Sequence, residues 1–278
     1  MSANKIPLAG VIGSPIAHSK SPILHKHWLN SYQIAGDYIP LDVSPENLKQ
    51  VLRTLPKMGF VGVNITIPHK EQALEIADIV TDQAAVIGAA NTLTFQEDGR
   101  IHADNTDGYG FIENLRHSAA GWSADAGPAA VIGAGGASRA VICALLQAGA
   151  SEIRLTNRTR ARAEALQQEF GDKLQIVDWA EAETMLKGAS TVVNTTSLGM
   201  VGHSQLQIGL DGLSTDAVVT DLVYTPLQTQ FLIKAWEKGC RTVDGLGMLL
   251  HQAVPAFERW FHKRPVVDQA LRQAVLSA

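Results

Sequence analysis

Six residues from Gly133 to Ser138, with the sequence Gly-Ala-Gly-Gly-Ala-Ser, have the composition of a turn that binds phosphate groups. They follow the apolar run 129–132, a predicted strand, and they open a predicted helix. In such a turn the first glycine allows a tight bend, the second lets the backbone approach a pyrophosphate, and the helix N-terminus offers N–H donors to the anion. Ser138 stands where glycine or alanine is usual. The segment predicts a dinucleotide site, and a glycine-rich turn without a ligand is the alternative.

The residues after the next predicted strand indicate which dinucleotide would bind. NAD-binding folds usually place an acid about 20 residues after the turn, where it holds the ribose 2′-hydroxyl. Here the strand that ends at Thr156 is followed by the run NRTRAR, which contains no acid and three arginines. Arginine binds phosphate through paired hydrogen bonds, whereas arginines at a helix N-terminus oppose the helix dipole. The run therefore favours NADP over NAD, with a solvated helix start as the alternative.

A second group of reactive residue types lies in the first part of the chain, where predicted strands end and helices begin. Ser19 and Ser21 precede a predicted helix, and two hydroxyls beside helix N–H groups suit a small carboxylate. Ser21 as an ordinary helix N-cap before Pro22 is the alternative. Further along, Thr66 ends a strand and Lys70 lies on a helix that Pro68 opens. A single lysine of this kind is usually a solvated surface charge, so it needs further support.

The elements that must position these residues alternate along the chain in the order of an α/β protein. Short apolar, β-branched runs predict strands, longer amphipathic runs predict helices, and their alternation is typical of parallel sheets. The small, turn-rich stretch 118–128 predicts a linker between two sets of elements. The expected strands are 8–12, 38–41, 61–65, 92–95, 129–132, 153–156, 192–193 and 218–222, and the expected helices are 22–34, 45–55, 137–147, 159–170, 248–261 and 265–276.

The composition argues against several other classes of protein. A chain of 278 residues suggests about two domains, and 46% hydrophobic with 18% charged residues is a globular balance. The net charge of −4 without a basic run argues against nucleic-acid binding. No apolar run approaches the ~20 residues that span a bilayer, and no secretory segment is expected. The two cysteines, Cys143 and Cys240, are expected to be free thiols in a reducing cytoplasm.

Eight motifs in a fixed order resemble the shikimate dehydrogenase family. They span residues 13–253 and read PIAHSKSP, VNITIPHK, GAANT, DNTDG, GAGGAS, NRT, DLVYTPLQT and DGLGMLLHQA. The resemblance implies an α/β substrate-binding domain over 1–107, a Rossmann-like NADP-binding domain over 108–243, and C-terminal helices over 244–278 that return to the first domain. It places the active site in the cleft between the domains. The implied reaction is the reversible NADPH-dependent reduction of 3-dehydroshikimate to shikimate, a step of aromatic amino-acid and chorismate biosynthesis.

The resemblance also implies roles for individual residues. Lys70 and Asp107, the second acid of DNTDG, form the catalytic pair. The implied substrate ligands are Ser19 and Ser21 at the carboxylate, Tyr224 at the same end, and Thr66, Asn91 and Gln252 at ring hydroxyls. The implied cofactor ligands are Gly133, Ala134, Gly135, Gly136, Ala137, Asn157, Arg158, Thr159, Arg162, Leu222 and Gly245.

The chemistry of carbonyl reduction agrees with a lysine in this role. Hydride addition to a carbonyl carbon leaves negative charge on the oxygen, which a nearby group must stabilise or protonate. A lysine beside the ring oxygen can donate that proton, and the carboxylate of Asp107 can orient the ammonium. Three histidines, His18, His69 and His251, adjoin the motifs, but they do not stand at the family's catalytic positions and are expected to be incidental or supporting. His69 stands where phenylalanine is common in the family.

Two alternatives and the expected partners complete the prediction. A quinate/shikimate dehydrogenase that uses NAD is opposed by Lys20 within SKSP and by the lack of an acid near Asn157. A non-catalytic dinucleotide sensor is opposed by the pair Lys70 and Asp107, which a binding module would not need. The only expected partner is the small-molecule substrate, with no nucleic acid, no membrane and no metal ion. The chain is expected to be a monomer or a homodimer.

Overall fold

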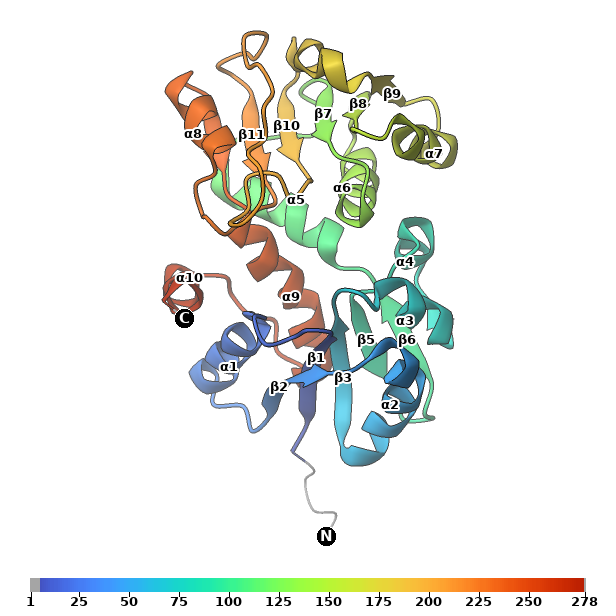
Figure 1. Ribbon diagram of the computed structural model, residues 1–278. Coiled ribbons are helices and arrows are strands. Elements are labelled where there is room, and N and C mark those ends of the chain that lie inside the picture. The colour runs from blue at the N-terminus through green and yellow to red at the C-terminus, as the bar shows by residue number, and fades with distance from the viewer. Residues whose placement is uncertain (1–5, 278) are drawn as a thin grey trace. The chain divides into compact units, whose positions relative to one another are not determined.

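Two separate six-stranded sheets divide the chain, and each forms the centre of its own unit (Figure 1). The computed structural model describes residues 6–277. The first unit comprises residues 6–106 and 252–277, and the second comprises residues 107–251. The helix that begins at Leu246 contributes to the second unit up to His251 and to the first from Gln252 onward. The functional domains 1–107, 108–243 and 244–278 stay a prediction.

The first unit has the strand order β2-β1-β3-β5-β6-β4. Its strands are β1 (Leu8–Gly13), β2 (Asp37–Asp42), β3 (Phe60–Ile65), β4 (Ile79–Val80), β5 (Thr92–Phe95) and β6 (Ile101–Asp104). Its helices are α1 (Ser21–Ser31), α2 (Leu48–Thr54), α3 (Lys70–Ile76), α4 (Asp82–Ile87), α10 (Gln269–Leu276) and most of α9 (Leu246–Phe261), with the short 3-10 turns η1 (Pro45–Asn47) and η2 (Leu55–Met58) flanking α2.

Strand β5 makes the first sheet mixed, which corrects the expectation of parallel sheets. It pairs antiparallel with both β3 and β6, whereas β1 is parallel to β2 and to β3. A short turn joins β5 to β6, closed by the Gln96 N–H on the Arg100 carbonyl at 2.9 Å and by Gly99 at a φ of 86°. Strands joined by so short a turn can only run antiparallel. Strand β6, which follows this turn, is not among the strands expected from the sequence.

An aromatic cluster fastens α9 to the first sheet. His25 of α1 stacks on Tyr38 of β2 with ring centroids 4.0 Å apart, and Trp28, Phe257 and Trp260 surround the pair. The Trp260 indole lies directly on β3, because a Cβ on Gly62 would come within 1.9 Å of the indole nitrogen. Apolar aromatic area of this kind is a main source of core stability. The last part of the chain therefore belongs structurally with the first.

Stability at mildly acidic pH should depend on His25. The side chain is fully buried, and its ring nitrogens have no hydrogen-bond partner among residues 6–277. Burial lowers the pKa of His25 from 6.5 to about 3, and the Asn64 side chain opposes only part of this fall. A histidine with a lowered folded-state pKa favours the unfolded state once the pH drops below the unfolded value. Between pH 6.5 and about pH 3, each unit of pH should remove about 1.4 kcal/mol of unfolding free energy.

Urea denaturation at pH 7 and pH 5 tests this expectation. The loss of unfolding free energy between the two should be about 2 kcal/mol smaller in His25→Phe than in the wild type. His27→Phe, on the same helix but only half-buried, is the matched control and should keep the wild-type difference. Equal differences in the wild type and His25→Phe would contradict the prediction.

The second unit has the strand order β12-β11-β10-β7-β8-β9, with every neighbouring pair parallel. Counted from β7, this is the 3-2-1-4-5-6 order of the dinucleotide-binding fold, which reverses direction between β7 and β10. Its strands are β7 (Ala129–Ile132), β8 (Ile153–Thr156), β9 (Leu174–Val177), β10 (Thr191–Asn194), β11 (Val218–Asp221) and β12 (Arg241–Val243). Its helices are α5 (Asp107–Ser118), α6 (Gly136–Gln147), α7 (Arg160–Phe170) and α8 (Gln230–Glu237), with the 3-10 segment η3 (Trp179–Leu186).

Both faces of the second sheet are covered by apolar packing. In β7 the alternate residues Ala129 and Val131 join one core, with α5 and α6, while Ala130 and Ile132 join another, with α8. All four are buried. A parallel strand covered on both faces reads as a continuous apolar run, which is why the sequence pattern located β7 correctly. The result is a rigid base for the turn that follows β7.

Candidate active site

The glycine-rich turn lies at the point where the strand order of the second sheet reverses. Gly133 has a φ of 108°, and a Cβ there would come within 2.7 Å of the Thr195 hydroxyl and the Thr196 methyl, which follow β10. A Cβ on Gly135 or Gly136 would meet nothing within 4 Å. The turn is thus closed against β10 and open on the other side, as an incoming pyrophosphate requires. Ligands of doubly wound sheets bind at this switch point.

Ser138, which departs from the usual pattern, fits the turn without opening it. Its side chain is fully buried, and its hydroxyl donates to the Gly135 carbonyl at 2.6 Å. The hydroxyl therefore supports the bend that precedes it. Asn157 supports the same turn from β8, because its Oδ1 accepts the Ala134 N–H at 3.1 Å and its Nδ2 donates to the Thr159 carbonyl at 2.8 Å. The predicted cofactor residues on the two loops are thereby brought together.

The three arginines after β8 differ in their surroundings. Arg160 is held by Glu164 at 2.8 Å and by Asp178, so its charge is already compensated. Arg158 and Arg162 are exposed, and neither guanidinium has a hydrogen bond or an ion pair within the described part of the chain. No acidic residue stands between Thr156 and Arg162. Two uncompensated arginines beside the turn suit a 2′-phosphate, so the residues present fit NADP.

The loop after β11 carries two further predicted cofactor residues and one substrate residue. Leu222 and Gly245 lie in contact, since a Cβ on Gly245 would come within 2.4 Å of the Leu222 carbonyl oxygen. Tyr224 is half-buried, and burial raises the pKa of its hydroxyl. The geometry brings Leu222 and Gly245 together from segments that are more than twenty residues apart.

Asp221 at the end of β11 organises this loop, although the sequence interpretation did not single it out. The carboxylate is fully buried and accepts hydrogen bonds from Asn194 Nδ2 at 3.0 Å, the Val223 N–H at 2.9 Å and the Thr229 hydroxyl at 2.7 Å. Burial raises the pKa of Asp221, and the three hydrogen bonds oppose this rise. The signal was present in the DLVYTPLQT motif, but an acid within a motif does not reveal what it contacts.

In the first unit, the two serines lie at the start of α1. The N-cap position is Lys20 rather than Ser21, and Ser21 is the first helical residue, so the N-cap alternative for Ser21 is wrong. The Ser19 hydroxyl instead accepts the Ser21 N–H at 3.3 Å. Ser21 is buried and Ser19 is half-buried. Both hydroxyls are therefore at a helix N-terminus, where N–H donors and the helix dipole favour an anion.

The segment after β3 places Thr66 and Lys70. The Thr66 N–H donates to the Ile12 carbonyl at 2.9 Å, which fixes the segment beside β1. Lys70 begins α3 and is half-buried, and its carbonyl accepts the Ala90 N–H at 2.9 Å, so its backbone lies beside the GAANT segment. His69 is fully buried, and its Nε2 lies 2.7 Å from the Val43 carbonyl, as befits a structural rather than a reacting group.

Asn91 and Gln252 meet although 161 residues separate them. Asn91 Nδ2 donates to Gln252 Oε1 at 3.4 Å, and both side chains are buried. The Thr106 N–H donates to Asn91 Oδ1 at 2.9 Å, and Asp107 is the next residue along the chain. Asp104 anchors this end of β6 through the Thr81 hydroxyl at 2.8 Å and through Arg259 of α9. The contacts of Asn91 and Asp104 thus depend on α9, which comes late in the chain but packs in the first unit.

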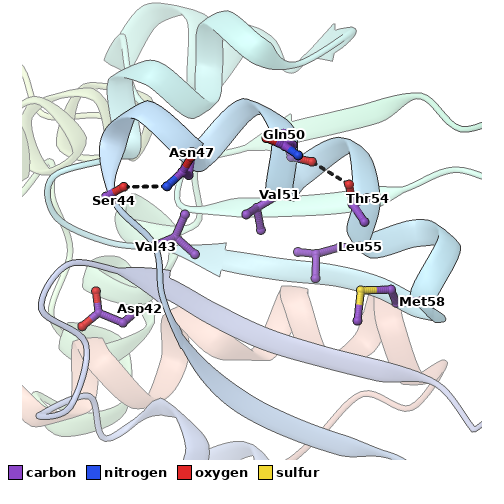
Figure 2. A pocket seen from close by; sticks show the side chains of 9 residues that line it. All are labelled: Asp42, Val43, Ser44, Asn47, Gln50, Val51, Thr54, Leu55 and Met58. Atoms are coloured by element: carbon purple, nitrogen blue, oxygen red, sulfur yellow. Dashed lines mark hydrogen bonds between the residues drawn. The ribbon is translucent and has the colours of Figure 1, made fainter.

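A groove elsewhere on the first unit is separate from these residues. It has a volume of about 440 Å³ and runs along α2, as Figure 2 shows. Its lining residues are Asp42, Val43, Ser44, Asn47, Gln50, Val51, Thr54, Leu55 and Met58. None of the predicted site residues lines it.

Within residues 6–277, no group of His, Cys, Asp and Glu side chains is arranged to hold a metal ion, and no helix is long and apolar enough to cross a membrane.

Known proteins are similar to this chain over nearly its full length. Family models described as "Shikimate dehydrogenase substrate binding domain", "Shikimate / quinate 5-dehydrogenase" and "Shikimate 5'-dehydrogenase C-terminal domain" match residues 11–93, 117–209 and 245–276. A protein from Roseobacter denitrificans, named shikimate dehydrogenase (NADP(+)), is 62% identical over 276 residues, which cover 99% of this chain and 100% of that protein. The chain belongs to the shikimate dehydrogenase family. This confirms the predicted family.

Solved structures of the shikimate dehydrogenase family share the fold. The shikimate 5-dehydrogenase of Thermus thermophilus, in complex with NADP(H) and shikimate, has a TM-score of 0.85 and 38% identity, covering 97% of this chain and 98% of that chain. The quinate dehydrogenase of Corynebacterium glutamicum, in complex with NAD, has a TM-score of 0.90 and 31% identity, covering 98% and 99%. The predicted α/β class with a Rossmann-like second part is thereby confirmed. Similarity of fold alone does not separate the two activities.

Proposed function

We propose that this chain catalyses the reversible NADPH-dependent reduction of 3-dehydroshikimate to shikimate, in aromatic amino-acid and chorismate biosynthesis. The observation that carries the proposal is the 62% identity, over almost the full length of both chains, to a protein named shikimate dehydrogenase (NADP(+)). Relatives from Ruegeria sp. and Paracoccus denitrificans with the same name are each 63% identical. The uncompensated Arg158 and Arg162 support the same choice of cofactor.

The cofactor residues are proposed from the second unit. Backbone N–H groups of the turn from Gly133 to Ala137 would hold the pyrophosphate, and Arg158 and Arg162 would hold the 2′-phosphate, with Asn157 and Thr159 shaping the loop between them. Leu222 and Gly245 would border the nicotinamide. When bound, NADPH supplies the hydride.

The proton is proposed to come from Lys70. As the ring carbonyl is reduced, its oxygen gains negative charge, and the ammonium of Lys70 donates one proton to give the alcohol. Asp107 orients that ammonium. In the oxidation direction the same lysine accepts the hydroxyl proton.

The remaining polar residues are proposed to hold the substrate. Ser19 and Ser21 would bind its carboxylate at the start of α1, with Tyr224 at the same end. Thr66, Asn91 and Gln252 would bind ring hydroxyls. Such contacts fix the orientation of the ring and so align the reacting carbon, which is a large part of catalysis by positioning.

Nicotinamide absorbance tests the function directly. Purified protein is given shikimate or quinate, each with NADP⁺ or NAD⁺, and the formation of the reduced nicotinamide is followed. We expect shikimate with NADP⁺ to give the highest kcat/KM. A higher value for quinate with NAD⁺ would favour the quinate/shikimate dehydrogenase alternative. No absorbance change with any combination would favour a non-catalytic sensor.

We also propose a cellular compartment, an oligomeric state and a set of partners for the enzyme. Cys143 and Cys240 are buried free thiols, as expected for a reducing cytoplasm. We propose a monomer or a homodimer, which sedimentation equilibrium would distinguish. The substrate is the only proposed partner.

A further inference from the structure

Hydrogen bonds hold the Asn91 side chain in one orientation. Its Oδ1 accepts from the Thr106 N–H at 2.9 Å, the Thr92 hydroxyl at 3.0 Å and the Thr106 hydroxyl at 3.2 Å. A carbonyl oxygen has two lone pairs, so the backbone N–H and one of the two hydroxyls are enough to fill its capacity. A reversed amide would turn its NH₂ group against the Thr106 N–H, and two donors would then face each other. The amide nitrogen is therefore fixed on the side of Gln252.

A second layer of hydrogen bonds holds the Thr92 side chain in place. Asn64 Nδ2 donates to Thr92 Oγ1 at 3.2 Å and to the Asn91 carbonyl at 3.1 Å, while Asn64 Oδ1 accepts from the Tyr38 hydroxyl at 2.8 Å. Thr92 Oγ1 also lies 3.2 Å from Thr106 Oγ1, where either hydroxyl can be the donor. Between them the two hydroxyls therefore have at least one proton to donate to Asn91 Oδ1. Asn64, Asn91, Thr92 and Thr106 are all at most 5% exposed. Buried networks of this kind strengthen one another and specify a single arrangement.

We infer that Thr92 and Thr106 are positioning residues, whose hydroxyls lock Asn91 so that it meets the substrate only as a hydrogen-bond donor. Asn91 thereby selects a ligand oxygen that accepts, such as the lone pair of a ring hydroxyl. This inference rests on the proposed function, in which Asn91 contacts the ring, and it assigns a task to two residues that the proposed function does not include among the substrate ligands.

Two substitutions of Thr92 distinguish the effect of its hydroxyl from the effect of its side-chain shape. Thr92→Val keeps the branched side chain that suits a strand and removes the hydroxyl, whereas Thr92→Ser keeps the hydroxyl. We expect Thr92→Val to raise the KM for shikimate about fivefold, since the Asn91 amide loses one of the donors that orient it. Both kcat and the KM for NADP⁺ should stay within twofold, because binding alone is weakened. Thr92→Ser should stay within twofold of wild type, and Thr106→Val should behave like Thr92→Val.

The chain offers a matched control on the same strand. Thr94 lies two residues further along β5, and its buried hydroxyl has no hydrogen-bond partner among the described residues. Thr94→Val should leave the KM for shikimate unchanged. In an Asn91→Ala background, Thr92→Val should add less than a twofold effect, because it acts through Asn91. The inference is overturned by an unchanged KM in Thr92→Val, by an equal rise in Thr92→Ser or Thr94→Val, or by additive effects in the Asn91→Ala background.

The network can also be tested without catalysis, which separates this inference from the proposed function. Wild-type turnover with shikimate and NADP⁺ tests the function. In ligand-free protein, the ¹⁵N side-chain amide resonance of Asn91, assigned by its loss in Asn91→Ala, should shift in Thr92→Val and not in Thr94→Val. An unshifted resonance in Thr92→Val would overturn the positioning role whatever the substrate proves to be.

Discussion

Replacement of Lys70 by alanine should lower kcat for shikimate oxidation about 1,000-fold, because a positioned general acid–base contributes about 10² to 10⁴ in rate. Lys70 stands at the start of α3, half-buried, and its backbone is fixed by the Ala90 N–H. Removal of the ammonium leaves this backbone contact in place. Binding of NADP⁺, measured by calorimetry, should therefore stay within twofold of wild type.

The matched control for Lys70 is another lysine of the first unit. Lys49 on α2 is exposed, and Lys49→Ala should retain wild-type kcat. If Lys70 and Asp107 act as a pair, Asp107→Asn should also lose orders of magnitude, and the double variant should be little worse than either single one. Turnover within threefold of wild type in Lys70→Ala would remove this lysine from the mechanism.

Replacement of Arg158 by alanine should raise the Kd and KM for NADP⁺ about 30-fold while leaving those for NAD⁺ within twofold. Hydrogen bonds between charged groups contribute about 1.5–3 kcal/mol, and NAD⁺ has no 2′-phosphate to lose them. Arg158 is exposed and has no ion-pair partner within the described chain, so its guanidinium does not support the fold. Calorimetric binding of the two cofactors measures the effect independently of turnover.

Arg160 is the matched control for Arg158, because it carries the same charge two residues away. Glu164 and Asp178 already compensate it, so Arg160→Ala should change the Kd for NADP⁺ less than threefold. Equal losses for NADP⁺ and NAD⁺ in Arg158→Ala would contradict the 2′-phosphate role. A larger effect of Arg160→Ala than of Arg158→Ala would show that the role had been assigned to the wrong arginine.

Local patterns in the sequence were sufficient for most of the fold. A parallel strand covered on both faces is a continuous apolar run, so β7 and β8 could be located within a residue. The glycine turn could be recognised because backbone geometry, rather than distant packing, demands those glycines. The family could be predicted from eight ordered motifs. By contrast, β9 and β12 were missed, because part of each strand is exposed and the continuous apolar run of a fully covered strand is absent.

The contacts that complete the site were decided by the tertiary structure. Three arginines after β8 looked alike, and only the fold shows that Asp178, 18 residues beyond Arg160, compensates one of them. Ser21 looked like a helix cap, but the helix begins one residue earlier than the pattern indicated.

By itself, the sequence determined the residue types available for chemistry, the glycine turn and the family, since each depends on neighbours along the chain. Only the tertiary structure decided that Gln252 of α9 meets Asn91, and that Thr92 and Thr106 orient its amide. A hydrogen bond depends on distances of a few tenths of an ångström between atoms from segments far apart in sequence, and no local pattern encodes those distances.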